Sequence, residues 1–167
     1  IADPETTEVD QAFIQYKTDN FTARVGRQVI TLDDHRFVGH VGWRQDRQTF
    51  DAVSAKYAAT DNLALFYSYL YKRNRIFAEA ADLDSKDHIL HATYTSKIGK
   101  FVAYAYLLEV DNDTDNALDT YGVSYDGNMK GDSVNWAYGA EFATQSSEAG
   151  AGEAATDFEA SYLNAYV

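Results

Sequence analysis

Arginine side chains are concentrated in one short part of the chain, because five of its seven arginines lie between residues 24 and 51. A guanidinium group stays charged at ordinary pH and presents a fixed set of hydrogen-bond donors to carboxylates. A surface built from several such groups favours anionic partners. The segment is therefore the first candidate for a functional region. Its arginines are Arg24, Arg27, Arg36, Arg44 and Arg47.

The same segment carries carboxylates that could neutralise these arginines. They are Asp33, Asp34, Asp46 and Asp51. Local ion pairs would fix a long loop against the rest of the fold and leave few free cations. Because the local charges nearly cancel, two interpretations stay open, a basic surface that meets solute and a set of local pairs.

The four histidines invite a catalytic or metal-binding interpretation that their spacing does not favour. His88 and His91 are three residues apart on a predicted strand, so they would face opposite sides of a sheet. The chain has no Gly-x-Ser-x-Gly and no His-Glu-x-x-His motif. We predict no catalytic residue, no enzyme activity and no cofactor.

Alternating carboxylates at Asp111, Asp113 and Asp115 resemble the opening of a calcium loop. An EF-hand also needs glycine at the sixth position and glutamate at the twelfth. This chain has Asn116 and Gly122 there. The three aspartates are weak candidate metal ligands, and we expect an acidic, solvated loop without a bound metal.

The elements that position these residues are predicted to be strands. Thirteen Tyr, nine Phe and two Trp accompany a single Pro and no Cys, a composition that favours strands over helices. No stretch reaches the ~18 to 20 apolar residues of a membrane-spanning helix. Apolar and polar residues alternate instead, which predicts nine strands. Their predicted ranges are 8–18, 21–33, 49–60, 63–77, 87–97, 101–111, 118–128, 132–146 and 156–167.

Each predicted strand has an apolar and a polar face. The apolar face of one strand contains Tyr121, Val123 and Tyr125. Those of two others are Val102, Tyr104, Tyr106 and Leu108, and Val134, Trp136, Tyr138, Ala140 and Phe142. We expect these faces to look outward into hydrocarbon while the alternate residues surround water. Aromatic residues near strand ends suit a girdle at the level of the lipid head groups. The candidates are Tyr67, Tyr69, Tyr71, Trp136, Tyr138, Tyr162 and Tyr166.

Short and long connections alternate strictly along the chain. Tight turns are predicted near residues 19–20, 61–62, 98–100 and 129–131, and longer polar connections at 34–48, 78–86, 112–117 and 147–155. Long loops at one end only are typical of an outer-membrane barrel. Nine strands would leave unpaired edges in lipid. We therefore predict an antiparallel, transmembrane, up-and-down β-barrel of which these strands form a part, in one barrel domain over residues 1–167.

Strand alternation also predicts which basic side chains face the water-filled interior. If Ala23 and Val25 face lipid, Arg24 faces inward. Lys17 and Lys56 also alternate with apolar neighbours and would point inward. Arg27 would face lipid unless a bulge near Gly26 shifted the register. Lys72 and Arg73 lie near a strand end, where we expect their head groups to reach the membrane interface.

The arginine-rich segment resembles the alginate-export family of outer-membrane porins. The matching residues are Val25-Gly26-Arg27-Gln28, Asp33, Arg36, Gly39, Trp43, Gln45 and Thr49-Phe50-Asp51-Ala52-Val53, in the order and spacing of that family. The detailed resemblance covers about residues 21–57. It implies a large barrel of roughly eighteen strands that carries a hydrophilic solute. It also implies that Arg27, Arg36, Arg44 and Arg47 line or gate the path.

Charge is distributed unevenly and limits the partners. Residues 1–75 hold ten basic and ten acidic residues, whereas 76–167 hold four and sixteen. Nucleic acid is disfavoured because phosphates need a basic surface. We expect a monomeric barrel in the outer membrane of a Gram-negative bacterium, in contact with lipid and lipopolysaccharide, that passes anionic sugar acids or oligosaccharides. Alternatives are a soluble secreted β-barrel or sandwich for ligand binding or adhesion, an outer-membrane enzyme and a purely structural barrel.

Overall fold

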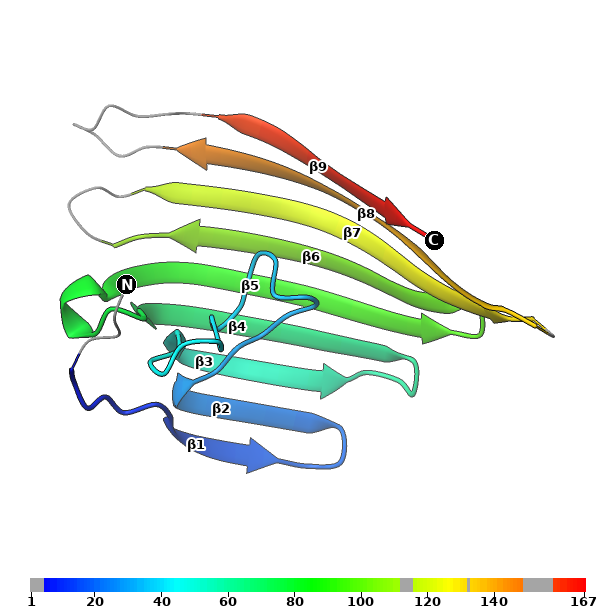
Figure 1. The fold of residues 1–167 in the computed structure, drawn as a ribbon. Coiled ribbons are helices and arrows are strands. Elements are labelled where there is room, and N and C mark those ends of the chain that lie inside the picture. Colours follow the sequence, from blue (N-terminus) through cyan, green and yellow to red (C-terminus); the bar gives the residue numbers. More distant parts are fainter. Residues whose placement is uncertain (1–4, 112–115, 132, 149–157) are drawn as a thin grey trace.

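The structure is a computed structural model that describes residues 5–111, 116–131, 133–148 and 158–167. The described residues form one nine-stranded sheet and one short helix (Figure 1). The elements are β1 (Ala12–Lys17), β2 (Phe21–Gln28), β3 (Thr49–Ala58), β4 (Leu63–Asn74), η1 (Glu79–Ala81), β5 (Leu83–Ser96), β6 (Gly99–Glu109), β7 (Ala117–Lys130), β8 (Asn135–Glu148) and β9 (Glu159–Tyr166). The described part of the chain has no helix with the length and hydropathy of a membrane span.

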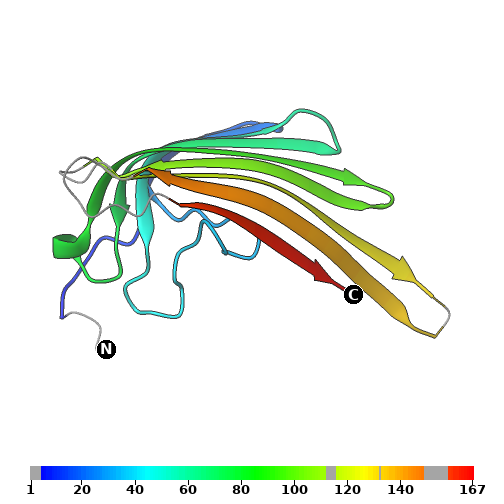
Figure 2. The same ribbon diagram turned by 90° about the horizontal axis from the view of Figure 1, so that it is seen from above.

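The strands follow one another across the sheet in sequence order, and every neighbouring pair is antiparallel. This up-and-down arrangement confirms the nine predicted strands. β1 and β9 lie at the two edges of the described sheet, as expected for an arc of a larger barrel. The sheet is strongly curved, and Figure 2 shows a segment between β2 and β3 on its concave side.

Three predicted boundaries differ from the structure by four or more residues. β1 begins at Ala12 instead of residue 8, β2 ends at Gln28 instead of residue 33, and β5 begins at Leu83 instead of residue 87. The second error matters most for the site. Residues 29–33 alternate like a strand, but they leave the sheet and cross its concave face.

The predicted alternation of short and long connections is confirmed, with all short turns at one end of the sheet (Figure 1). In the first turn the Thr18 N–H donates to the Phe21 carbonyl oxygen at 2.8 Å. Gly99 begins β6 with a φ of 150°, where an added Cβ would lie 2.4 Å from the Asp126 carbonyl oxygen. Glycine is therefore required at that close approach.

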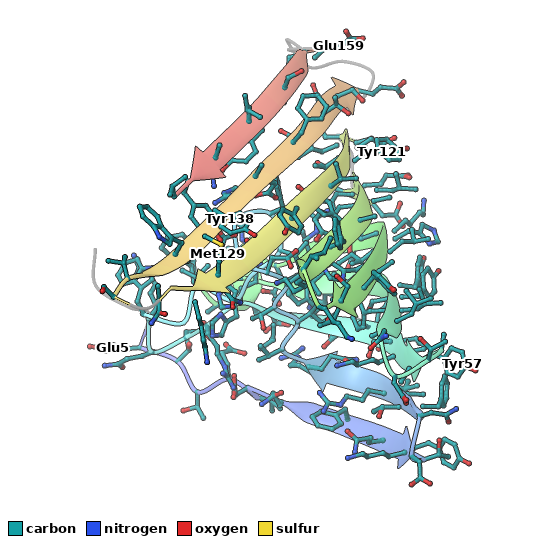
Figure 3. The ribbon with its side chains drawn as sticks, turned by 90° about the vertical axis from the view of Figure 1, so that its right-hand side faces the viewer. Glu5, Tyr57, Tyr121, Met129, Tyr138 and Glu159 are labelled. Atoms are coloured by element: carbon teal, nitrogen blue, oxygen red, sulfur yellow. The ribbon has the colours of Figure 1, made fainter. Side chains whose placement is uncertain are left out.

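The convex face carries the exposed apolar residues of the sheet. Val123 is 56% exposed and Phe142 is 47% exposed, so the apolar faces predicted for their strands do point outward. Figure 3 shows Tyr57 and Tyr121 on the outside of the curve. The exposed aromatic residues near the short turns include Tyr57, Tyr94, Phe101 and Trp136, those nearer the long connections include Tyr71 and Tyr121, and Tyr67 lies near the middle of β4. Alanine, valine and leucine lie between them, as in a lipid-facing band with two aromatic girdles.

The outward orientation predicted for β6 was wrong. Val102, Tyr104 and Tyr106 are 3%, 6% and 1% exposed and belong to the core on the concave side, against which Leu108 also packs. Tyr162 and Tyr166 likewise face the concave side, since Tyr162 packs on that core and the Tyr166 hydroxyl donates to Asp126 at 2.7 Å. The girdle prediction therefore fails for these two residues. The physical reason for the inward tyrosines of β6 is the segment between β2 and β3, which covers them.

We predict that a charge on the convex face is far more damaging than the same charge on the neighbouring concave position. Replacing Val123 with Arg at the middle of β7 should lower the free energy of unfolding by ~2 to 4 kcal/mol, the range for lipid-facing arginine near the bilayer midplane. Reversible unfolding of the full-length protein from lipid vesicles measures this. Ser124→Arg, one residue away and on the concave face, is the control and should change stability little. Equal losses for both variants would contradict the assignment of the two faces.

Candidate functional site

Residues 29–48, which we call the strap, leave β2, cross the concave face and return to β3 (Figures 1 and 2). The strap has its own backbone hydrogen bonds. The Leu32 N–H donates to the Val38 carbonyl oxygen at 3.2 Å, and the Gln48 N–H donates to the His40 carbonyl oxygen at 2.9 Å. Its apolar residues Ile30 and Val38 are buried against the sheet. The strap is therefore a packed element and a part of the concave surface.

An aromatic contact holds the tip of the strap. The Phe37 ring lies 5.7 Å from the Tyr104 ring, 6.2 Å from the Tyr106 ring and 6.0 Å from the Tyr162 ring. Tyr104 and Tyr106 are stacked at 4.7 Å. Aromatic pairs at these distances are worth ~0.5 to 1.5 kcal/mol each beyond the buried area. The tip thus docks on β6 and β9.

Charged contacts surround this aromatic cluster. Arg36 forms an ion pair with Glu141 of β8 and a second one with Asp34 at 2.5 Å. Its guanidinium also lies 4.7 Å from the centre of the Tyr162 ring. The Tyr104 hydroxyl donates to Glu141 at 2.7 Å. Sequence reasoning missed Glu141, because no local pattern links it to an arginine 105 positions away.

A third contact joins the strap to β5. The His91 Nε2 lies 3.1 Å from an Asp33 carboxylate oxygen. This hydrogen bond lowers the pKa of Asp33 below its ordinary value, against the opposing effect of burial. The two histidines of β5 do face opposite sides, as predicted, because the His88 Nδ1 lies 2.9 Å from the Tyr67 hydroxyl on the convex face.

A cavity of about 540 Å³, which we call the basic hollow, lies between the start of the strap and β2 to β5. Its size falls within the ~300 to 1,000 Å³ of small-molecule sites. Arg24 and Lys56 line it together with hydroxyl and amide side chains. The Arg24 guanidinium donates to Gln15 at 2.8 Å and lies 4.9 Å from the centre of the Phe13 ring. Two of the predicted basic residues therefore meet in one hollow. The polar neighbours are Thr22, Gln28, Thr31, Ser54 and Thr93, and Asp33 and His91 complete the charged and titratable lining.

A second cavity of about 350 Å³, the acidic hollow, lies between the strap tip and β6 to β9. Its charged lining consists of Asp33, Asp34, Asp126, Glu141 and Lys100. The Lys100 ammonium lies 3.5 Å from an Asp126 oxygen. Asp33 lines both hollows, so the two cavities are neighbours under the strap.

The other predicted basic residues do not join the basic hollow. Arg27 lies opposite Asp51 and pairs with it at 2.9 Å, on the face of β2 that also carries the exposed Val25. Arg47 pairs with Asp10 at 2.6 Å. This ion pair lowers the pKa of Asp10, with the hydrogen bond from Arg47 as the largest cause.

Arg44 and Lys17 occupy two further environments. The Arg44 guanidinium lies 4.6 Å from the centre of the Trp43 ring and 5.4 Å from that of Phe77, so it is part of an aromatic contact of the strap. Lys17 ends β1 and lies opposite Thr22, which lines the basic hollow. Lys17 is therefore close to that hollow without being part of its lining.

The arginine-rich segment combines the two arrangements considered above, a set of local ion pairs and a basic surface open to solute. Local pairs exist between Arg36 and Asp34 and between Arg27 and Asp51. Arg24 instead faces the basic hollow. Asp33 pairs with a histidine of another strand rather than with an arginine of its own segment.

The weak metal candidates are only partly described. Asp111 forms an ion pair with Lys86 at 2.9 Å. Asp113 and Asp115 lie outside the described residues. Within the ranges that the structure covers, no group of three or more His, Asp or Glu residues is placed to hold a metal ion.

The interfacial position expected for Arg73 was wrong. Arg73 donates to both oxygens of Asp87 at 2.5 and 2.7 Å, and Asp87 is fully buried. Lys72 lies 3.2 Å from Asp82. Alternation places Arg73 near a strand end, but it does not show that the next strand supplies a buried carboxylate. A buried charge needs such a partner.

We predict that Phe37 is the main anchor of the strap. Phe37 is partly buried, so Phe37→Ala should weaken docking by about 3 kcal/mol, the lower end of the range for truncation of core phenylalanines, and speed exchange of the strap amides roughly a hundredfold. Hydrogen exchange at Leu32 and Gln48 measures the effect. Trp43→Ala removes a 79% exposed ring from the same strap and should leave exchange nearly unchanged. Unaltered protection in Phe37→Ala would show that other contacts hold the strap.

Docking of the strap should also depend on the ionisation of Asp33. The pKa of Asp33 is lowered in the docked state, so its contribution is present above its ordinary pKa and is lost as the pH falls through the lowered value. Docking should therefore weaken below about pH 4. Exchange rates, corrected for intrinsic pH dependence, should change less in Asp33→Asn than in the unmodified protein. The same pH response in both proteins would remove Asp33 from the docking equilibrium.

Comparison with known proteins yields one match. A family model described as "Alginate export" matches residues 2–163, nearly the whole chain and far more than the arginine-rich segment. No curated protein and no solved structure matches the chain. Since the family model covers β1 to β8 and reaches into β9, the chain belongs to the alginate export family.

Proposed function

We propose that this chain forms part of the wall of a channel that passes hydrophilic anions, such as sugar acids or oligosaccharides, along the concave face of the sheet. The observation that carries the proposal is the basic hollow, where Arg24 and Lys56 share one cavity with polar side chains. Residues 1–167 belong, in this proposal, to one barrel domain.

Membership of the alginate export family gives the coarser part of this function. The chain is a segment of an outer-membrane β-barrel that serves in transport. The family is one of channels rather than enzymes. The kind of solute and the roles of individual residues are the proposal.

The chemistry of the basic hollow supports an anionic solute. Guanidinium and ammonium groups donate charge-assisted hydrogen bonds to carboxylates. Hydroxyl groups of Thr22, Ser54 and Thr93 line the same cavity and can exchange hydrogen bonds with sugar hydroxyls. Several weak contacts of this kind bind a solute without trapping it, as transport requires.

The position of the strap favours a narrow, selective pore over a wide one. It covers a large part of the concave face, so a solute would pass between the strap and the remaining wall. Fixed charge has its greatest effect where a path is narrow and its walls have a low dielectric constant. Arg36, Arg44 and Arg47 hold the strap in this proposal, while Arg24, Lys56 and the neighbouring Lys17 meet the solute.

The convex face supports the proposed lipid partners. Its exposed apolar band suits acyl chains, and its aromatic residues suit the head-group level of phospholipid or lipopolysaccharide. A monomeric barrel is part of the proposal, since no second copy is needed to cover this face.

We predict that Arg24→Glu lowers the anion preference of the full-length channel. Reversing one wall charge should reduce the anion-to-cation permeability ratio about two- to threefold at moderate salt, because the interaction is screened beyond roughly 10 Å. Single-channel reversal potentials in a salt gradient measure the ratio.

Lys97→Glu is the matched control, since it makes the same charge change in an exposed turn outside the hollow. Its ratio should stay close to that of the unmodified channel. If Arg24→Glu and Lys56→Glu both leave the reversal potential unchanged, anions do not pass the basic hollow and the proposed selectivity is wrong.

A further inference from the structure

We propose that the concave face separates charge across its width, so that anions follow the β1 to β3 side and are repelled from the β6 to β9 side. The inference rests on the proposed channel function, because it divides the same inner wall into two regions. We call the β1 to β3 side the first lane and the β6 to β9 side the second lane. The new content of the inference is that the acidic residues of β7 and β8 take part in selectivity.

The cations of the first lane form a compact group. Lys17 lies opposite Thr22, and Thr22 lies opposite Lys56, so all three share one row across β1 to β3. Two strand spacings of ~4.8 Å place the two lysines about 10 Å apart. Arg24 lies on the same face of β2, one alternate position beyond Thr22.

These three cations keep their charge unpaired within the described part of the chain. Arg24 donates to the neutral side chain of Gln15 at 2.8 Å. No described carboxylate forms an ion pair with Lys17 or Lys56. Asp33, which lines the same hollow, is bound to His91. The first lane therefore has a net positive charge.

The second lane has the opposite sign. The acidic hollow contains four carboxylates, Asp33, Asp34, Asp126 and Glu141, and one cation, Lys100. Arg36 adds one more cation by pairing with Asp34 and Glu141. Asp33 also lines the basic hollow and is paired with His91, so Asp34, Asp126 and Glu141 against Lys100 and Arg36 leave an excess of one negative charge. An anion near β7 and β8 would therefore meet repulsion.

The distance between the lanes lets each lane set its own local ion concentration. Arg24 on β2 and Asp126 on β7 are five strand spacings apart, which is ~24 Å along the sheet at 4.8 Å per strand. The Debye length is only ~10 Å at 0.1 M salt. The two hollows meet at Asp33, but the fields of Arg24 and Asp126 are largely screened at one another, so the charges of the two sides do not average to a single lumen charge.

The order of the strands explains how the separation arises. In an up-and-down sheet each strand lies beside its sequence neighbours, so a change of charge along the chain becomes a change of charge across the sheet. Residues 1–75 are balanced, with ten basic and ten acidic side chains, whereas 76–167 hold sixteen acidic and four basic ones. The strap carries Asp33 and Asp34 over to the acidic side and strengthens the contrast.

Single cysteines test the separation directly, because the chain contains none of its own. Thr22→Cys places a thiol in the basic hollow and Ser124→Cys places one in the acidic hollow. Each variant of the full-length channel in lipid vesicles is treated with a negatively charged or a positively charged methanethiosulfonate of similar size. The ratio of the two modification rates should be roughly tenfold higher at residue 22 than at residue 124.

A second substitution links the difference to named charges. Lys56→Gln should lower the ratio at residue 22 roughly two- to threefold and leave the ratio at residue 124 unchanged. Asp126→Asn should raise the ratio at residue 124 and leave the ratio at residue 22 unchanged. Ion conductance before labelling shows that each variant has inserted, and Thr93→Cys and Asn164→Cys in the same hollows replace any variant that fails to do so.

Two results distinguish failure of the inference from failure of the proposed function. Equal rate ratios at the two positions, in channels that conduct, would overturn the separation of charge and leave the channel function standing. Conduction without any labelling at either position would show that solute does not pass the concave face, and both proposals would then be wrong.

Discussion

Docking of the strap on the concave face is the interaction on which the rest of the structure depends, because it decides which inner side chains stay open to solute. Phe37 covers the stacked Tyr104 and Tyr106, and Arg36 forms an ion pair with Glu141. Aromatic and charged contacts thereby narrow the β6 to β9 side to the acidic hollow. Over β2 to β5 the start of the strap is joined to the sheet by the Asp33–His91 contact, and there the basic hollow remains. Tyrosines would otherwise present large apolar surfaces to water, so the strap and β6 require one another.

The strands, their order and the alternation of short and long connections could be predicted from the sequence. Alternating apolar and polar residues and the residue types of tight turns are both local signals. The strap could not. Ile30 and Leu32 alternate with polar residues as strand residues do, yet they pack on the sheet as part of a crossing segment. For the same reason β6 was assigned the wrong orientation. Alternation shows that two faces differ, but which one points inward depends on what covers it.

The candidate site likewise contains some residues that could be predicted from local sequence signals and others that could not. The inward position of Arg24 and Lys56 follows from strand alternation alone, and both line the basic hollow. The residues that bind the strap are remote in sequence. Asp33 contacts His91, 58 residues further along the chain, and Arg36 contacts Glu141, 105 residues further along. Composition indicates an acidic second half without showing where its carboxylates lie. Only the register of the strands places Asp126 and Glu141 beside the strap.

Backbone strain opposes the contacts that hold the strap. Asp33, His35 and Val41 all adopt positive φ angles, of 50°, 63° and 50°, a region that costs an L residue ~1 to 3 kcal/mol and disfavours a branched residue most. The aromatic and ionic contacts of the tip must exceed that sum for docking to be stable. The free energy of docking is therefore a difference between two opposing contributions of similar size, the stabilising contacts of the tip and the backbone strain of the strap. Its position on the wall can respond to changes of a few kcal/mol, whereas the sheet, in which each inner strand pairs on both sides, cannot respond in this way.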